Sequence, residues 1–165
     1  MAPTASLQAR YYARRAMPPI YRAPMRTRDR DDVPAGAGAQ HGVERGLVGI
    51  GPGEGEKAGR MRAAFVDLPE GTFVWTRVLD GTYRLGRVRG PWRRDDSAAA
   101  RAVGLCDVRP AMWMARAFGE DEVPRAVAAT FARGGLNLQR THDAEAERLT
   151  EELWARRDEQ RLCDG

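Results

Sequence analysis

The sequence predicts an α+β fold in which a small rolled sheet of about five strands carries short peripheral helices and a C-terminal helix. The main observation is a hairpin pattern, in which residues 72–77 and 82–92 are rich in β-branched and aromatic side chains and flank Asp80-Gly81. This dipeptide favours a type I′ turn, which joins two antiparallel strands. The second observation is a series of separate strand and helix signals around the hairpin, which together favour a compact, partly open barrel.

Further strands are predicted on both sides of the hairpin. Residues 46–51 form a short apolar run, and residues 105–115 form a longer one in which Pro110 favours an edge or a bulge. Residues 136–140 alternate between apolar and polar, which indicates a final strand. By the two-residue period of a strand, the side chains of the first hairpin strand divide between two faces, one with Phe73, Trp75 and Arg77 and the other with Val74 and Thr76.

Helices are predicted at residues 56–66, 95–103, 124–131 and 143–157. The last has the clearest signals, because Asp143 can cap it, acidic residues crowd its first turns and arginines close it. We expect the buried face of the first helix to carry Met61, Ala64 and Phe65. The candidate caps of the second helix are Asp95, Asp96 and Ser97. The apolar stripe of the last helix consists of Ala146, Leu149, Leu153 and Trp154.

By composition the chain divides into three parts. Residues 1–43 form a basic tail rich in arginine, proline and glycine, and we expect disorder there because no apolar pattern would offset the entropy of ordering it. Residues 44–142 are the predicted folded domain, and residues 143–165 are an acidic amphipathic helix with a short tail. The net charge is +4, and the 27 basic residues include a single lysine, Lys57. Because a GC-rich genome produces this arginine bias, arginines alone are weak evidence for phosphate binding.

The sequence contains no recognisable catalytic or metal-binding constellation. The two histidines are His41, in the basic tail, and His142, beside the cap of the last helix, while Cys106 and Cys163 match no metal or redox spacing. We therefore expect a protein that is not an enzyme and has no cofactor and no metal. No apolar run approaches the ~20 residues that cross a bilayer, and no apolar leader is evident, so we expect a cytoplasmic location without membrane contact.

The candidate binding residues are aromatic side chains and arginines on the predicted sheet. An aromatic ring can stack on a nucleobase, and an arginine can bind a phosphate group or a base edge. The alternative interpretation is that Trp75 and Trp113 are core residues, as alternating aromatic residues of strands usually are. Trp92 follows Gly90-Pro91 at a strand exit, where loops carry function. The complete candidate set is Trp75, Tyr83, Arg87, Trp92, Arg93, Arg109 and Trp113.

A set of motifs occurs in a fixed order, namely Val74-Trp75-Thr76-Arg77, Asp80-Gly81, Tyr83-x-Leu85-Gly86-Arg87-Val88-x-Gly90-Pro91-Trp92-Arg93, Val108-Arg109-Pro110-x-x-Trp113, Val123-Pro124 and Leu138-Gln139-Arg140. In their order and spacing these motifs resemble a bacterial family of EVE-like domains. That family belongs to the PUA-like superfamily, which also contains the YTH and SRA base readers. The resemblance covers roughly residues 46–142.

The resemblance implies a PUA-like pseudobarrel that binds DNA or RNA, encloses a flipped, modified base in an aromatic pocket and works in a restriction or defence setting. It also implies that Trp75 and Trp113 lie at that pocket, with Tyr83, Trp92 and Arg109 around it. Relatives tend to have Gly-Ile-Gly-Trp-Gly at the first strand, whereas this chain has proline, Pro52, at the tryptophan position. The alternative is therefore a protein-interaction adaptor with a degenerate base pocket, which acts through the acidic C-terminal helix.

Overall fold

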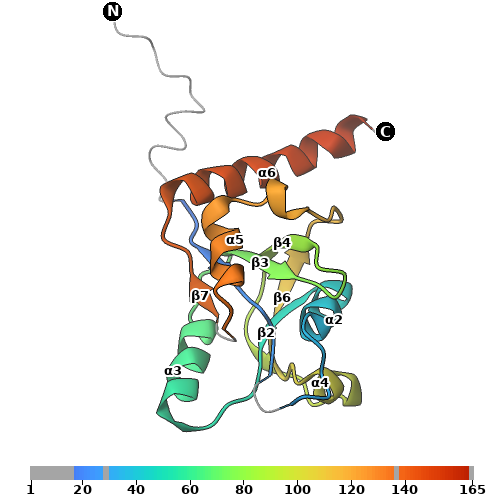
Figure 1. The fold of residues 1–165 in the computed structure, drawn as a ribbon, viewed down its shortest axis with the longest axis vertical. Helices are drawn as coiled ribbons and strands as arrows, with labels where there is room; N and C mark the ends of the chain where they lie inside the picture. Colours follow the sequence, from blue (N-terminus) through green and yellow to red (C-terminus); the bar gives the residue numbers. More distant parts are fainter. Residues whose placement is uncertain (1–16, 28–29, 136–137, 164–165) are drawn as a thin grey trace, which may run out of the picture.

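A curled, mixed β-sheet with the shape of a half-barrel lies at the centre of this α+β protein, and helices pack around it (Figure 1). The computed structural model describes residues 17–27, 30–135 and 138–163. Within these residues the strand order is β2-β6-β4-β3-β1-β7, and β5 also pairs with β6. The strands are β1 (Ile20–Arg22), β2 (Leu47–Ile50), β3 (Phe73–Arg77), β4 (Tyr83–Val88), β5 (Arg93–Arg94), β6 (Asp107–Trp113) and β7 (Gln139–Arg140). The helices are α2 (Ala37–Arg45), α3 (Gly55–Val66), α4 (Ala98–Val103), the 3-10 helix η1 (Glu120–Glu122), α5 (Arg125–Ala132) and α6 (Ala144–Cys163).

The predicted hairpin is confirmed, but its turn is of another type. β3 and β4 pair in antiparallel register, and the backbone N–H of Val78 donates to the carbonyl of Thr82 at 3.0 Å. The loop between Val78 and Thr82 therefore has three residues, of which only Gly81 has a positive φ, 84°. A three-residue loop of this kind is built from a type I turn that ends in a left-handed glycine. The carboxylate of Asp80 stabilises it by accepting from the N–H of Thr82 at 2.9 Å.

Apolar side chains cover both faces of the sheet, and the alternation predicted for β3 is confirmed. Phe73 and Trp75 belong to one buried cluster, whereas Val74 belongs to the other. Helices α5 and α6 contribute Val127 and Trp154 to the cluster of Phe73 and Trp75. Because both faces are covered, alternation in this sheet separates two cores and does not separate a core from solvent.

The predicted boundary at residue 44 is wrong. β1 pairs in parallel with β3, with Ile20 opposite Phe73, and α2 packs against the sheet through small residues. A Cβ atom on Gly42 would lie 2.7 Å from the carbonyl oxygen of Leu47, so glycine here permits close packing and does not indicate disorder. His41, which was expected in a tail, is buried in α2. The first sixteen residues of the predicted tail lie outside the described residues.

Pro110 does not mark an edge strand, because β6 is central and pairs with β2 on one side and with β4 and β5 on the other. On the second side, β4 pairs as far as Ala111 and β5 begins at Val108, so Pro110 lies at the gap between them. The N–H of Arg89 donates to the carbonyl of Pro110 at 2.8 Å across this gap. The proline is therefore tolerated where the ladder changes partner and requires no donor from it.

The four predicted helices are present as α3, α4, α5 and α6. Ser97 caps α4 by accepting from the N–H of Ala100 at 3.2 Å, and Asp143 caps α6 by accepting from the N–H of Ala146 at 2.8 Å. Ala64 is exposed, contrary to expectation. α6 also continues to Cys163, six residues beyond the predicted end. Of the predicted final strand at residues 136–140, the first two residues lie outside the described residues and the last two form β7.

Gly86 of β4 is expected to tolerate no side chain, because the indole ring of Trp113 covers it. A Cβ atom there would lie 2.5 Å from Cε3 and 2.7 Å from Cδ2 of that ring. Gly86→Ala should therefore lower the free energy of unfolding by about 1–3 kcal/mol in urea titrations, the usual cost of overpacking. The matched control is Gly59→Ala, because a Cβ atom at Gly59 on α3 meets nothing within 4 Å. The control should stabilise α3 slightly, and equal stability of both variants would contradict the packing described.

Candidate nucleic-acid interface

Two of the predicted binding residues, Trp75 and Tyr83, lie in the hydrophobic core. Trp75 is fully buried, its ring meets that of Phe118 edge-on at 5.3 Å, and its Nε1–H donates to Oγ1 of Thr150 at 3.1 Å. Tyr83 packs edge-on against Phe131, and burial raises the pKa of its hydroxyl. Rings that are enclosed in this way by neighbouring side chains offer no face to a ligand.

Trp113 lies on the other side of the sheet from Trp75, so the two rings do not form a cage. Trp113 packs against the cluster of Val74 and donates from Nε1 to the carbonyl of Leu47 at 3.0 Å. The physical reason is the register of the sheet. Trp113 is paired with Gly86, whereas Trp75 is paired with Leu85, and neighbouring residues of a strand point to opposite faces.

Arg109 and Arg87 are used inside the fold. Arg109 is buried and donates from Nη1 to the carbonyls of Phe65 and Leu68 at 3.0 and 2.6 Å, which fixes the end of α3 to the sheet. Burial lowers the pKa of the Arg109 guanidinium. The guanidinium of Arg87 lies over the rings of Phe73, at 4.5 Å, and Trp154, at 5.7 Å. Both arginines thus join elements of the protein to one another.

The two remaining predicted residues, Trp92 and Arg93, lie on the surface. Trp92 is 38% exposed, and its Nε1–H donates to Oδ1 of Asp107 at 3.0 Å. Arg93 is exposed and begins β5, opposite Val108 of β6. The hydrogen bond to Asp107 fixes the edge of the indole while part of the ring remains accessible to solvent. A ring held in this way can stack on a flat ligand without first losing much conformational freedom.

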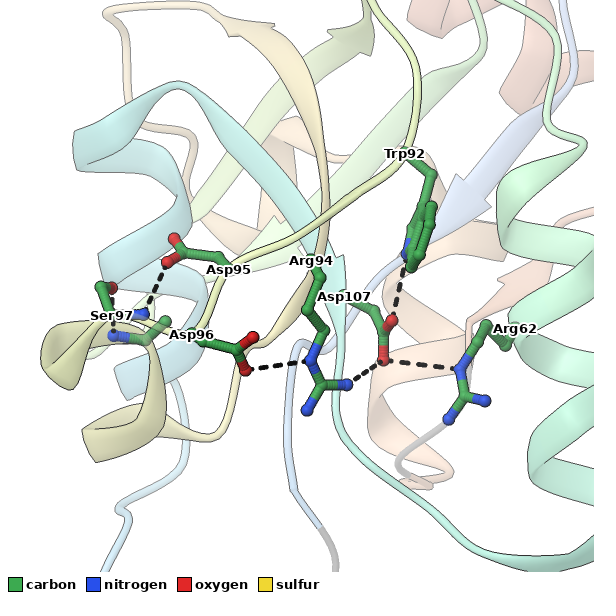
Figure 2. A network of polar contacts seen from close by, with 8 residues as sticks. Arg62, Trp92, Arg94, Asp95, Asp96, Ser97 and Asp107 are labelled. Carbon is green, nitrogen blue, oxygen red and sulfur yellow. Dashed lines mark hydrogen bonds and ion pairs between the residues drawn. The ribbon is translucent and has the colours of Figure 1, made fainter.

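Asp107 is the centre of a charged network that the sequence did not reveal (Figure 2). Its carboxylate is almost fully buried at the start of β6, and Oδ2 has no hydrogen-bond partner among the described residues. Two guanidinium groups approach Oδ2 from opposite sides, Nε of Arg62 at 3.6 Å and Nη1 of Arg94 at 3.7 Å. These distances are those of ion pairs and are too long for hydrogen bonds.

The guanidinium groups of the network remain available to a ligand. The side chains of Arg62 and Arg94 are 42% and 48% exposed, and an arginine has five N–H donors, of which Asp107 engages none at hydrogen-bonding distance. On the far side of Arg94, Asp96 accepts from its Nε at 3.2 Å. Asp95 turns away and accepts from the N–H of Ser97 at 3.0 Å, which begins the turn into α4.

Four parts of the chain build this surface, hereafter the Trp92 surface, defined by Arg62, Trp92, Arg94 and Asp107. Arg62 comes from α3, Trp92 from the loop before β5, Arg94 from β5 and Asp107 from the first position of β6. One signal for it was present in the sequence, because Asp107 is a lone carboxylate inside an apolar run. A buried acid in such a position requires cationic or hydrogen-bonding partners.

The C-terminal helix offers less free surface than predicted. Ala146 and Trp154 of its expected apolar stripe are buried, and the ring of Trp154 meets that of Phe73 edge-on at 5.7 Å. Thr150 between them is also buried. The side of α6 that carries Ala146, Thr150 and Trp154 therefore packs against the fold and is not exposed to a partner protein.

Within the part of the chain that the structure describes, no group of three or more His, Cys, Asp or Glu side chains is arranged to hold a metal ion. None of the helices in these ranges is both long enough and apolar enough to cross a membrane. Compared with protein-family models, with curated proteins and with solved structures, the chain gives no match. The candidate site therefore depends on its own geometry.

Proposed function

We propose that this protein is a nucleic-acid-binding module of the PUA-like type, in which the Trp92 surface contacts a single DNA or RNA strand. The observation that carries the proposal is the half-exposed indole of Trp92, held at its Nε1–H by the buried carboxylate of Asp107 and flanked by exposed arginines. Stacking of a base on an aromatic ring contributes ~1–3 kcal/mol and tolerates any base. The arginines would bind the adjacent phosphate groups.

The position of the Trp92 surface supports a strand that passes over the molecule. Arg62 on α3 and Arg94 on β5 lie on either side of the aspartate, so phosphates on both sides of a stacked base would meet a guanidinium (Figure 2). Arg93 precedes Arg94 in β5, and neighbouring residues of a strand point to opposite faces, so the positive charges on the face of Asp107 are those of Arg62 and Arg94. Asp107 and Asp96 offset part of this charge, and we therefore expect stacking to contribute more of the affinity than phosphate contacts do.

Recognition of a modified base, and a role in restriction or defence, rest on the family resemblance. A cage between Trp75 and Trp113 is not available to such a base, because the two rings lie in separate cores. A modified base would instead stack on Trp92. Paired oligonucleotides with and without base methylation test this part of the proposal separately, since a preference for the methylated strand supports it and equal affinity removes it.

Replacing Trp92 by alanine should weaken binding of a labelled single-stranded oligonucleotide of about 12 nucleotides by roughly 5- to 100-fold, as measured by fluorescence anisotropy. Trp92→Phe is the matched control. It loses the hydrogen bond to Asp107 but keeps an aromatic face, so it should retain most of the affinity.

Arg94→Gln should reduce the slope of log affinity against log salt by about 0.7, the value of one phosphate contact on a single strand.

Arg125→Gln on α5 controls for the loss of one positive charge outside the Trp92 surface and should change neither affinity nor salt slope. The proposal fails if the wild-type protein binds neither DNA nor RNA at low salt. It also fails if Trp92→Ala and Arg94→Gln bind as the wild type does.

A further inference from the structure

A pocket of about 270 Å³ lies between β1, the start of α2, the β3–β4 turn and the residues after α5. The charged residues of its lining are all arginines, Arg22, Arg26 and Arg77, and no acidic side chain of the described residues lines it. Phe131 and Val78 supply apolar surface beside them. The volume is close to the lower end of ordinary ligand pockets. A cavity of one charge sign with an apolar wall fits a small amphipathic anion.

Arg22 has the properties of a group that lacks its counter-ion. Its side chain is only 4% exposed, and it donates from Nη1 to the carbonyls of Thr130 and Gly134. Its Nε is buried and has no hydrogen-bond partner among the described residues. Burial, and then the charge of Arg133, lower the pKa of the Arg22 guanidinium. Buried charges are normally paired, whereas the acceptors of this guanidinium among the described residues are carbonyl groups and not carboxylates.

The first turn of α2 adds a second attractive element to the same pocket. The helix has nine residues, its N-cap Gly36 provides no side-chain cap, and its first turn contains no acidic residue. Gly36 and the preceding Ala35 both line the pocket. The N-terminal end of a helix carries a partial positive charge and unpaired N–H groups, both of which favour anions.

We propose that this pocket binds a small organic anion, with a phosphate or carboxylate group against Arg22, Arg26 and Arg77 and an aromatic or aliphatic body against Phe131 and Val78. The arginines differ in their roles. Arg22 is buried and fixed by its two carbonyl acceptors, whereas Arg26 and Arg77 are exposed at the pocket, and Arg77 donates from Nε to the carbonyl of Gly81 at 3.0 Å. None of the residues that line this pocket belongs to the Trp92 surface, so the proposal does not depend on nucleic-acid binding.

Isothermal titration calorimetry of the full chain with phenyl phosphate, benzoate and benzyl alcohol tests the proposal. At least one of the two anions should bind saturably, and the stronger of the two identifies the preferred group. The neutral alcohol should not bind. Arg26→Gln and Arg77→Gln should each weaken the preferred anion about tenfold or more, because each removes a hydrogen bond to a charged group. Arg22 is left unchanged, since its replacement would also release the carbonyls of Thr130 and Gly134.

Arg45→Gln, an exposed position in the last turn of α2, is the control for loss of charge and should bind the anion as the wild type does. Trp92→Ala should also bind it unchanged, which separates this pocket from the proposed nucleic-acid interface. The proposal is overturned if neither anion binds at concentrations up to about 10 mM. It is equally overturned if benzyl alcohol binds as well as the anions, or if both arginine variants keep the wild-type affinity.

Discussion

Replacing Arg109 by methionine is expected to lower the free energy of unfolding by about 2–4 kcal/mol. The guanidinium of Arg109 is buried and donates to four carbonyl groups, those of Phe65, Val66, Leu68 and Gly90. Methionine fills similar volume but leaves these acceptors without their donor, and a buried polar group that loses its partner costs ~1–3 kcal/mol. Removal of a buried charge offsets part of this cost.

Urea titration monitored by circular dichroism measures the effect of Arg109→Met. Arg89→Met is the matched control, because it makes the same substitution at an exposed arginine, and it should change stability by less than about 0.5 kcal/mol. If Arg109→Met is as stable as the control, Arg109 does not tie α3 to the sheet. In that case a direct role in ligand binding would again be open for this residue.

Trp75→Ala is expected to be the most destabilising single change, at about 3–5 kcal/mol, which is a large share of the ~5–15 kcal/mol that holds a typical domain. Trp75 is fully buried, and its replacement leaves a cavity beside Phe118. It also removes the hydrogen bond that joins β3 to Thr150 of α6.

Two comparisons by thermal denaturation separate these effects. Thr150→Val keeps the volume and removes only the acceptor of the Trp75 indole, so it should cost about 1–3 kcal/mol. Trp92→Ala opens no cavity in the core but takes the hydrogen-bond donor from the buried carboxylate of Asp107, so it should cost about 1–3 kcal/mol. A loss at Trp75 no larger than the loss at Trp92 would contradict the assignment of Trp75 to the core.

The hairpin and the caps of the helices could be predicted because their causes are local. Asp80-Gly81, Ser97 and Asp143 each act within a few residues of the sequence. β1 could not be predicted, since a strand of three residues exists only through its pairing with β3 and β7, both more than fifty positions away. The glycines of α2 were misleading for a related reason, because their function is close approach to distant backbone.

The candidate site was predicted only in part. Alternation along β3 correctly placed Trp75 and Val74 on opposite faces, but it could not show that helices cover both faces. The sequence therefore overestimated the number of accessible rings. Trp92 was singled out by its place after Gly90-Pro91, whereas its partners Arg62 and Asp107 were missed. These two residues are 30 and 15 positions away, and only the curling of the sheet and the docking of α3 bring them to the indole.

The most direct test of the Trp92 surface is a nuclear magnetic resonance titration that follows the four tryptophan indole N–H signals, each assigned by a tryptophan-to-phenylalanine variant. Trp75 and Trp113 donate to partners inside the protein, whereas Trp92 donates to Asp107 at the surface. On addition of a single-stranded oligonucleotide, the Trp92 signal should shift and the Trp75 and Trp113 signals should stay in place. A shift of Trp75 or Trp113 with an unchanged Trp92 signal would contradict the account.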